Sequence, residues 1–92
     1  MTDKPLEIIT IIAGWVVIGY ITEVQFDQWV ISNVYCIRDY GTTQGLGQLA
    51  ISGPTNTTKM DKMKDLLRVR PSNILFTQEC DPTHWTKYYP PT

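Results

Sequence analysis

The sequence lacks the charge excess that is typical of nucleic-acid-binding proteins. Lys and Arg together number eight, against nine Asp and Glu, for a net charge of −1. Because phosphate backbones are attracted mainly by excess positive charge, general DNA or RNA binding is disfavoured, although a local basic patch is compatible with a neutral total. The low charged fraction of 18%, beside 42% apolar residues, indicates a compact body with surface suited to association.

Catalytic and metal-binding residues are scarce as well. His84 is the one histidine, and the chain has two cysteines, Cys36 and Cys80. Cys80 and His84 lack the further pair of ligands that a tetrahedral zinc site needs, and a single histidine beside Trp85 favours a packed or surface group over a general base. We therefore predict no enzymatic activity, no metal and no cofactor. Both cysteines lie in apolar stretches, which favours reduced, buried thiols over a disulfide.

No apolar run is long enough to predict a membrane span. The longest run, residues 6–21, is shorter than the ~20 residues of a spanning helix and contains Gly14 and Gly19. Most of its side chains are β-branched, which favours strands because branching at Cβ restricts rotamers in a helix. A chain of 92 residues is also too short for two independent cores, so we expect one domain over residues 1–92.

Apolar runs separated by turn residues predict five strands. Ala13-Gly14 and residues 25–28 mark turns, and Ser32-Asn33 is a place where a bend or bulge would fit. The expected strands cover about residues 6–12, 15–24, 29–38, 66–70 and 74–80.

The remaining residues predict loops and short helical turns. Residues 41–58 are rich in Gly and Thr, with a short helical turn at 46–51 bounded by Gly47 and Gly53. The charged segment 59–65 is typical of a solvated turn or brief helix. In the tail, residues 81–92, Asp81-Pro82 has the pattern of a helix cap and first helical residue, which predicts one turn docking Trp85.

This arrangement predicts a mainly β fold, a small five-stranded barrel with the long Gly/Thr loop between its third and fourth strands. Residues 14–21 followed by 29–34 resemble the second and third strands of Sm-like domains, where a glycine permits strong bending. The resemblance implies an SH3-like or Sm-like barrel.

The Gly/Thr loop is the candidate binding site. Glycine allows backbone amides to converge on an anion, and threonines add hydroxyls. If the third and fourth strands approach each other, Arg38, Arg68 and Arg70 line one rim and could bind a phosphate in bidentate fashion. Tyr40 could stack on a base. Alternatively the glycines only shape the loop, and Leu46, Leu49 and Ile51 pack it onto the barrel or a neighbouring subunit; both interpretations stay open. The candidate ligand-binding residues are Arg38, Tyr40, Gly41, Thr42, Thr43, Gln44, Gly45, Gly47, Thr55, Arg68 and Arg70.

Residues 37–55 carry a family resemblance. Their Ile-Arg, Gly-Thr-Thr, Gly-Leu-Gly, Leu-Ala and Gly-Pro-Thr segments are similar to a family of small proteins of tailed bacteriophages and prophages to which no activity is attached. The similarity spans roughly residues 15–85 and includes Arg68-Val69, Cys80 and Trp85, whereas residues 59–67 depart from the family pattern. It implies a phage protein located in the cytoplasm of the infected bacterium.

Three functions follow from these observations. The first is a non-catalytic phage accessory protein that forms homo-oligomers and sequesters a small phosphorylated or nucleotide signal of host defence. The second is an inhibitor that binds a host protein or defence complex, since abundant Trp and Tyr suit interface anchors. The third is an Sm-like RNA binder or minor virion protein, of which RNA binding is disfavoured by the charge balance.

Overall fold

Two long strands form the centre of the structure, a computed structural model that describes residues 5–43, 45–64 and 66–90. They are β2 (Trp15–Val24) and β3 (Trp29–Asp39), which pair antiparallel from Val17↔Cys36 to Val24↔Trp29. Their bounds agree with the predicted 15–24 and 29–38, because β-branched runs flanked by turn residues favour extended backbone.

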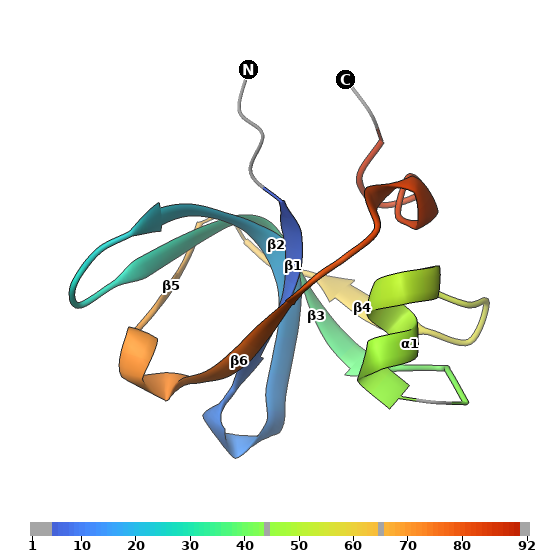
Figure 1. Cartoon of the computed structure of the whole chain (residues 1–92), viewed down its shortest axis with the longest axis horizontal. Helices are drawn as coiled ribbons and strands as arrows, with labels where there is room; N and C mark the ends of the chain where they lie inside the picture. Colours follow the sequence, from blue (N-terminus) through green and yellow to red (C-terminus); the bar gives the residue numbers. More distant parts are fainter. Residues whose placement is uncertain (1–4, 44, 65, 91–92) are drawn as a thin grey trace.

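The other strands extend this pair into one antiparallel sheet (Figure 1). The strand order is β4-β3-β2-β1-β6, and β5 pairs with β3 beside this path. Three of these strands, at 6–11, 67–69 and 74–79, match predicted ones. The bounds are β1 (Leu6–Ile11), β4 (Lys59–Lys62), β5 (Leu67–Val69) and β6 (Ile74–Glu79).

The prediction of a turn or brief helix at residues 59–65 was wrong for its first four residues. They form β4, in which Met60 is half-buried while Lys59, Asp61 and Lys62 are exposed. The alternation is hidden because Met60 is the one apolar residue on the inner face, and Lys62, two residues on, shares that face over the Tyr35 ring. The described residues therefore form six strands rather than the five predicted.

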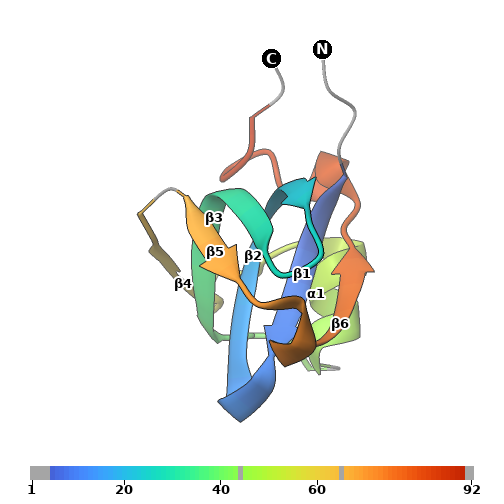
Figure 2. The ribbon, with the colours of Figure 1, turned by 90° about the vertical axis from the view of Figure 1, so that its left-hand side faces the viewer.

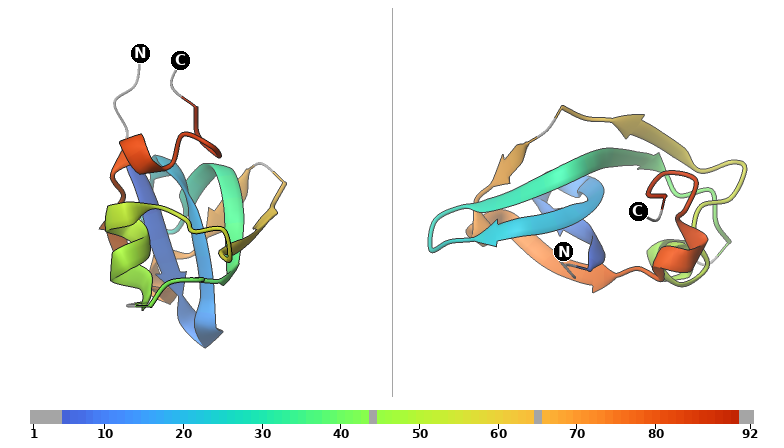
Figure 3. Two further views of the ribbon diagram at one scale, coloured as in Figure 1. Left: turned by 90° about the vertical axis from the view of Figure 1, so that its right-hand side faces the viewer. Right: turned by 90° about the horizontal axis from the view of Figure 1, so that it is seen from above.

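The sheet is open (Figure 3). Its pairing order ends at β6 on one side and at β4 on the other, and no pairing joins these ends among the described residues. The predicted mainly β architecture is confirmed, whereas the predicted closure into a barrel is not.

β3 bends at its middle, as the Ser32-Asn33 pair predicted. The register with β2 shifts between Ile18 and Tyr20, where β3 has one residue more than β2, and Asn33 has a φ of 53°. Gly19 lies against this bulge: a Cβ on Gly19 would come 2.7 Å from Ile31 Cγ2 and 2.8 Å from the Ser32 carbonyl oxygen. A bulge of this kind increases local twist, and only glycine leaves room for it here.

The bend sends the two halves of β3 to different partners. The first half pairs with β5 at Val30↔Arg68, and the second pairs with β4 at Cys36↔Asp61 (Figure 2). β4 and β5 therefore lie one after the other along the same edge of β3.

The sheet is buried on both faces. Ile8 and Ile18 belong to a core with Leu49 and Trp85, while their chain neighbours Ile9 and Val17 belong to a second core with Val69. Successive side chains of a strand point to opposite faces, so the two cores lie on either side of the sheet. This explains why the run at residues 6–21 is nearly continuously apolar instead of alternating.

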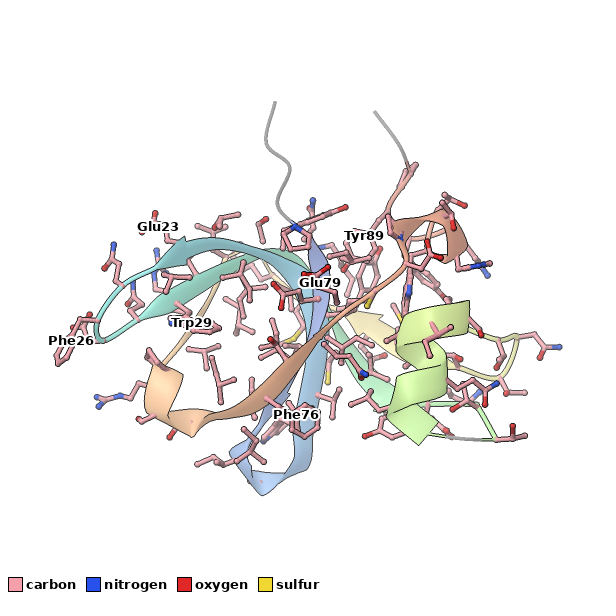
Figure 4. All side chains as sticks on the ribbon, viewed as in Figure 1. Glu23, Phe26, Trp29, Phe76, Glu79 and Tyr89 are labelled. Carbon is pink, nitrogen blue, oxygen red and sulfur yellow. The ribbon has the colours of Figure 1, made fainter. Side chains whose placement is uncertain are left out.

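The C-terminal tail covers one of these faces. The Asp81 carboxylate accepts a hydrogen bond from the Thr83 amide at 3.1 Å and caps a 3₁₀ turn, η3 (Pro82–His84), after which Trp85 is fully buried. The Tyr89 hydroxyl reaches the carbonyl oxygens of Ile18, at 3.1 Å, and Asn33, at 2.5 Å (Figure 4). The predicted cap and the docking of Trp85 are confirmed.

Both cysteines are free thiols, as predicted, but the predicted burial holds for Cys80 and was wrong for Cys36. Cys80 is buried, and burial raises its pKa to about 12, while Cys36 is only half-buried. No helix of the described residues is both long and apolar enough to cross a membrane.

The bulge makes a specific prediction for Asn33. Its side chain is exposed, so replacing it tests the backbone alone. Asn33→Val should lower the free energy of unfolding by about 1–2 kcal/mol, because a β-branched residue resists positive φ. Asn33→Gly, the matched control, should change it by less than about 1 kcal/mol. Urea unfolding measures both, and equal losses in the two variants would contradict the bulge.

Candidate functional site

The Gly/Thr loop is held closed by threonine hydroxyls. Thr55 Oγ1 donates to the Gly41 carbonyl oxygen at 2.6 Å, and Thr57 Oγ1 donates to the same oxygen at 3.1 Å. Thr58 Oγ1 donates to the Tyr40 carbonyl oxygen at 2.6 Å. Hydrogen bonds from side chains at one end of the loop to the backbone at the other end thus hold the two ends together. The hydroxyl protons point at these carbonyl oxygens and not outward toward a ligand.

Several loop amides that we expected to converge on an anion donate within the loop. The Gly41 amide donates to Asp39 Oδ1 at 3.1 Å, and the Thr55 amide donates to Thr58 Oγ1 at 2.8 Å. The Thr57 amide donates to Thr55 Oγ1, and the Thr58 amide donates to the Thr55 carbonyl oxygen, both at 3.2 Å. An amide used in this way is not available to a phosphate without breaking an internal bond.

Other predicted loop residues belong to the helix α1 (Gly45–Ser52) or form hydrogen bonds with it. Thr42 Oγ1 donates to the Gly45 carbonyl oxygen at 2.8 Å, and Thr43 Oγ1 lies 3.1 Å from Gln48 Oε1. Gly45, with a φ of 76°, is the first helical residue. Gln44, also a predicted site residue, lies outside the described residues.

α1 packs on the sheet through Leu49 and Ala50, which are buried, and through Leu46 beside them. Ile51, which we expected to pack with them, is exposed instead. The helix includes Gly47, predicted as its boundary, and stops before Gly53, as predicted. These contacts favour the interpretation in which the glycines shape the loop.

The structure does not bring the three candidate arginines together. Arg68 pairs with Val30 in the first half of β3, whereas Arg38 lies near the end of the second half, eight residues further along the strand. At about 3.3 Å per residue that stretch of chain is far longer than an arginine side chain. Arg70 is exposed and precedes the 3₁₀ turn η2 (Pro71–Asn73). Tyr40 packs against the core that contains Trp85, so its ring is only partly available for stacking.

A different group of residues lines an open depression of about 250 Å³. The register of β2 with β3 at Val17↔Cys36 brings the start of β2 and the end of β3 to the same end of the sheet. β4 then adds Asp61 opposite Cys36. Trp15 is 58% exposed here although tryptophan is usually well covered. The depression is lined by Gly14, Trp15, Val16, Cys36, Ile37, Arg38 and Asp61.

Arg38 and Asp61 form a bidentate ion pair within the depression. Arg38 Nε donates to Asp61 Oδ2 at 2.8 Å, and Arg38 Nη2 donates to Asp61 Oδ1 at 3.1 Å. These hydrogen bonds lower the pKa of Asp61 and raise the pKa of Arg38. Burial, and next the Asp61 charge, raise the pKa of Cys36, so the thiol in the depression is a weak nucleophile. The depression combines an aromatic residue with a hydrogen-bonded ion pair, an arrangement that suits binding of a partner.

The sequence contained only weak signals for this depression. Trp15 begins a strand whose other residues are mostly core, and nothing in the spacing of the chain links Arg38 with Asp61 across 23 residues. The pairing depends on β4, the strand that the pattern of charges concealed.

Comparisons with protein-family models, with curated proteins and with solved structures give no match for this chain. The phage-family resemblance therefore stays a prediction.

The ion pair makes a prediction for Asp61. In Arg38→Ala the pKa of Asp61 should return to the ordinary range near 4, because its hydrogen-bonded cation is gone. A lowered pKa stabilises the fold above the unfolded-state value and loses that effect as pH falls through the folded-state value. The stability difference between wild type and Arg38→Ala should therefore shrink on acidification. Carboxyl NMR titration and unfolding at several pH values measure this; an unchanged Asp61 pKa would contradict the pair.

Two loop glycines should respond oppositely to alanine. Gly41 has a φ of 67°, and a Cβ there would collide with the Thr58 backbone, so Gly41→Ala should cost at least about 1–2 kcal/mol. Gly47 lies inside α1 with open space around it, and Gly47→Ala should stabilise the protein by about 1 kcal/mol. Thermal or urea unfolding compares them. Loss of stability in Gly47→Ala would contradict the helix.

Proposed function

We propose that the protein is a non-catalytic binding module that inhibits a partner protein by docking it over the depression of Trp15, Arg38 and Asp61. The observation that carries the proposal is that Trp15, more than half exposed, and the Arg38–Asp61 bidentate pair line the same depression. Tryptophan and arginine are among the residues that dominate binding energy in protein interfaces.

The pairing of Arg38 with Asp61 suits a docking surface. A guanidinium already held by two hydrogen bonds loses less conformational entropy when a partner covers it than a free side chain does. A neutralised pair also costs less to remove from water than an isolated charge. The exposed part of Trp15 can then supply apolar burial at the centre of the contact.

The setting we propose is the cytoplasm of a phage-infected bacterium, where the partner is a host protein or defence complex. Support comes from the resemblance of residues 37–55 to a family of small phage proteins. A small fold with an exposed aromatic anchor needs no catalytic groups for inhibition, because covering a surface is enough.

Sequestration of a phosphorylated or nucleotide signal is the second candidate. Arg68 and Arg70 are both exposed and near each other in the chain, which favours it. The internal hydrogen bonds of the Gly41 and Thr55 amides weigh against the loop as its site. No specific observation favours RNA binding or a virion role.

We also propose that the open sheet is related to the SH3-like and Sm-like barrels. Support comes from the linear strand order and from the bend at Gly19, the position at which the sequence resembles the bending strand of Sm-like domains.

The docking proposal is tested by tryptophan truncation. Trp15→Ala should reduce retention of a stoichiometric bacterial partner at least about 30-fold, the equivalent of the 2 kcal/mol or more of a central interface residue. Phe26→Ala is the matched control, because Phe26 is fully exposed at the tip of the β2–β3 hairpin, outside the depression (Figure 4). Affinity capture from host lysate, followed by titration with the purified partner, measures both.

Two results would count against docking at this surface. One is the absence of any stoichiometric partner, and the other is a partner retained equally by wild type and Trp15→Ala. Native mass spectrometry of the same preparations separates the second candidate, because a retained nucleotide adds a discrete mass that the docking proposal does not expect.

A further inference from the structure

β6 is an edge strand of the sheet. It pairs with no strand other than β1 among the described residues, but α1 contacts it, and the Asp81 amide just beyond its end donates to the Ala50 carbonyl oxygen of α1 at 3.0 Å. Its six residues include two large exposed apolar residues, Leu75 at 60% and Phe76 at 52%. Figure 3 shows this strand along the outer side of the sheet, and Figure 4 places Phe76 beside the turn that joins β1 to β2. Unpaired edges with apolar side chains are templates for strand addition.

The register identifies which β6 backbone groups face outward. The Cys80 amide donates to the Leu6 carbonyl oxygen at 2.8 Å, in line with the register that pairs Glu7 with Glu79. Hydrogen-bonded pairs alternate along an antiparallel ladder, so Gln78, opposite Ile8, also bonds to β1. Thr77 and Glu79 lie between these positions and direct their amide and carbonyl groups away from β1.

The opposite edge of the sheet is protected in a way that β6 is not. β4 carries Lys59 and Lys62 on four residues, and β5 has only three residues. Lysines and short strands are the usual means of blocking edge-to-edge pairing. β6 contains no lysine and no proline, and its one charge, Glu79, is at its end.

We propose that a second copy of this chain pairs with β6 antiparallel, with Thr77 of the two copies facing each other across a two-fold axis. The outward amide and carbonyl groups of Thr77 in one strand then meet those of Thr77 in the other, which is a hydrogen-bonded pair of an antiparallel ladder. The resulting sheet is continuous across the two molecules.

In this register the side chains of the two copies are complementary. Phe76 faces the partner's Gln78, and Leu75 faces the partner's Glu79. The two Glu79 carboxylates lie at opposite ends of the interface, whereas pairing the strands in parallel would place them side by side. Like charges directly opposite each other destabilise strand pairs, so the antiparallel two-fold arrangement is the favoured one.

The proposed dimer interface does not overlap the proposed docking surface. The edge uses β6, while the depression is lined by residues of β2, β3 and β4 and by Gly14 of the β1–β2 turn. Since β1 lies between β6 and β2 in the sheet, each copy keeps its own Trp15 surface. One strand per copy makes a smaller contact than the roughly 800 Å² per partner of stable complexes, so the dimer should be weak and concentration-dependent.

Edge-blocking substitutions test the dimer by sedimentation equilibrium over a concentration series reaching about 0.5 mM. Thr77→Pro removes an outward amide without breaking a bond to β1, and proline is tolerated at such edge positions. Phe76→Lys places a positive charge on the exposed edge, which opposes strand pairing. It replaces Thr77→Pro as the test variant if circular dichroism shows that Thr77→Pro does not fold. Phe26→Lys is the matched control, with the same exchange at an exposed aromatic at the tip of the β2–β3 hairpin, away from Phe76 (Figure 4).

Wild type and Phe26→Lys should approach twice the monomer mass as concentration rises, while Thr77→Pro and Phe76→Lys stay monomeric. A wild type that is monomeric throughout, or folded edge variants that associate as wild type does, would overturn the proposal. A Thr77→Pro variant that stays monomeric but still binds a partner through Trp15 would show that the dimer interface and the docking surface are separate. If no partner is captured, the docking proposal fails, and the sedimentation result still decides the dimer proposal.

Discussion

The structure depends on one backbone constraint, the bulge at Asn33 packed against Gly19. The bulge turns β3 enough for its two halves to pair with different strands, and the absence of a side chain at Gly19 lets the two backbones approach. The Tyr89 hydroxyl then bonds to the Asn33 carbonyl oxygen, so the C-terminal tail docks on the bend itself. Pairing, core and tail are thus joined at one place.

The same constraint determines which side chains meet. Because the second half of β3 continues beside β4, Asp61 lies opposite Cys36, two residues before Arg38, and its carboxylate engages the Arg38 guanidinium before any ligand arrives. Because the first half pairs with β5, Arg68 is carried to the other end of β3. The Gly/Thr loop joins the end of β3 to the start of β4 and is closed by its own hydroxyls. It is therefore a structural connection, and the best candidate surface is the one that contains Trp15.

Features of the fold that depend on residues close together in the sequence could be predicted, and features that depend on distant residues could not. The bounds of β2, the cap at Asp81 and the bend at Asn33 rest on neighbouring residues, so the sequence predicted them. β4 was missed because its charges conceal a single inward residue, Met60. The separation of Arg38 from Arg68 depends on the register of paired strands, which no local pattern encodes. The exposure of Trp15 likewise depends on what the rest of the fold leaves uncovered.

Cross-strand nuclear Overhauser effects along β3 test this account most directly, because they report the two partners of the bent strand without a substitution. The account predicts contacts of Val30 with Arg68 and of Cys36 with Asp61 in the same molecule. Contacts that instead place Arg68 beside Arg38 would contradict it, because they would bring the cations together at the Gly/Thr loop and remove the bend as the organising feature.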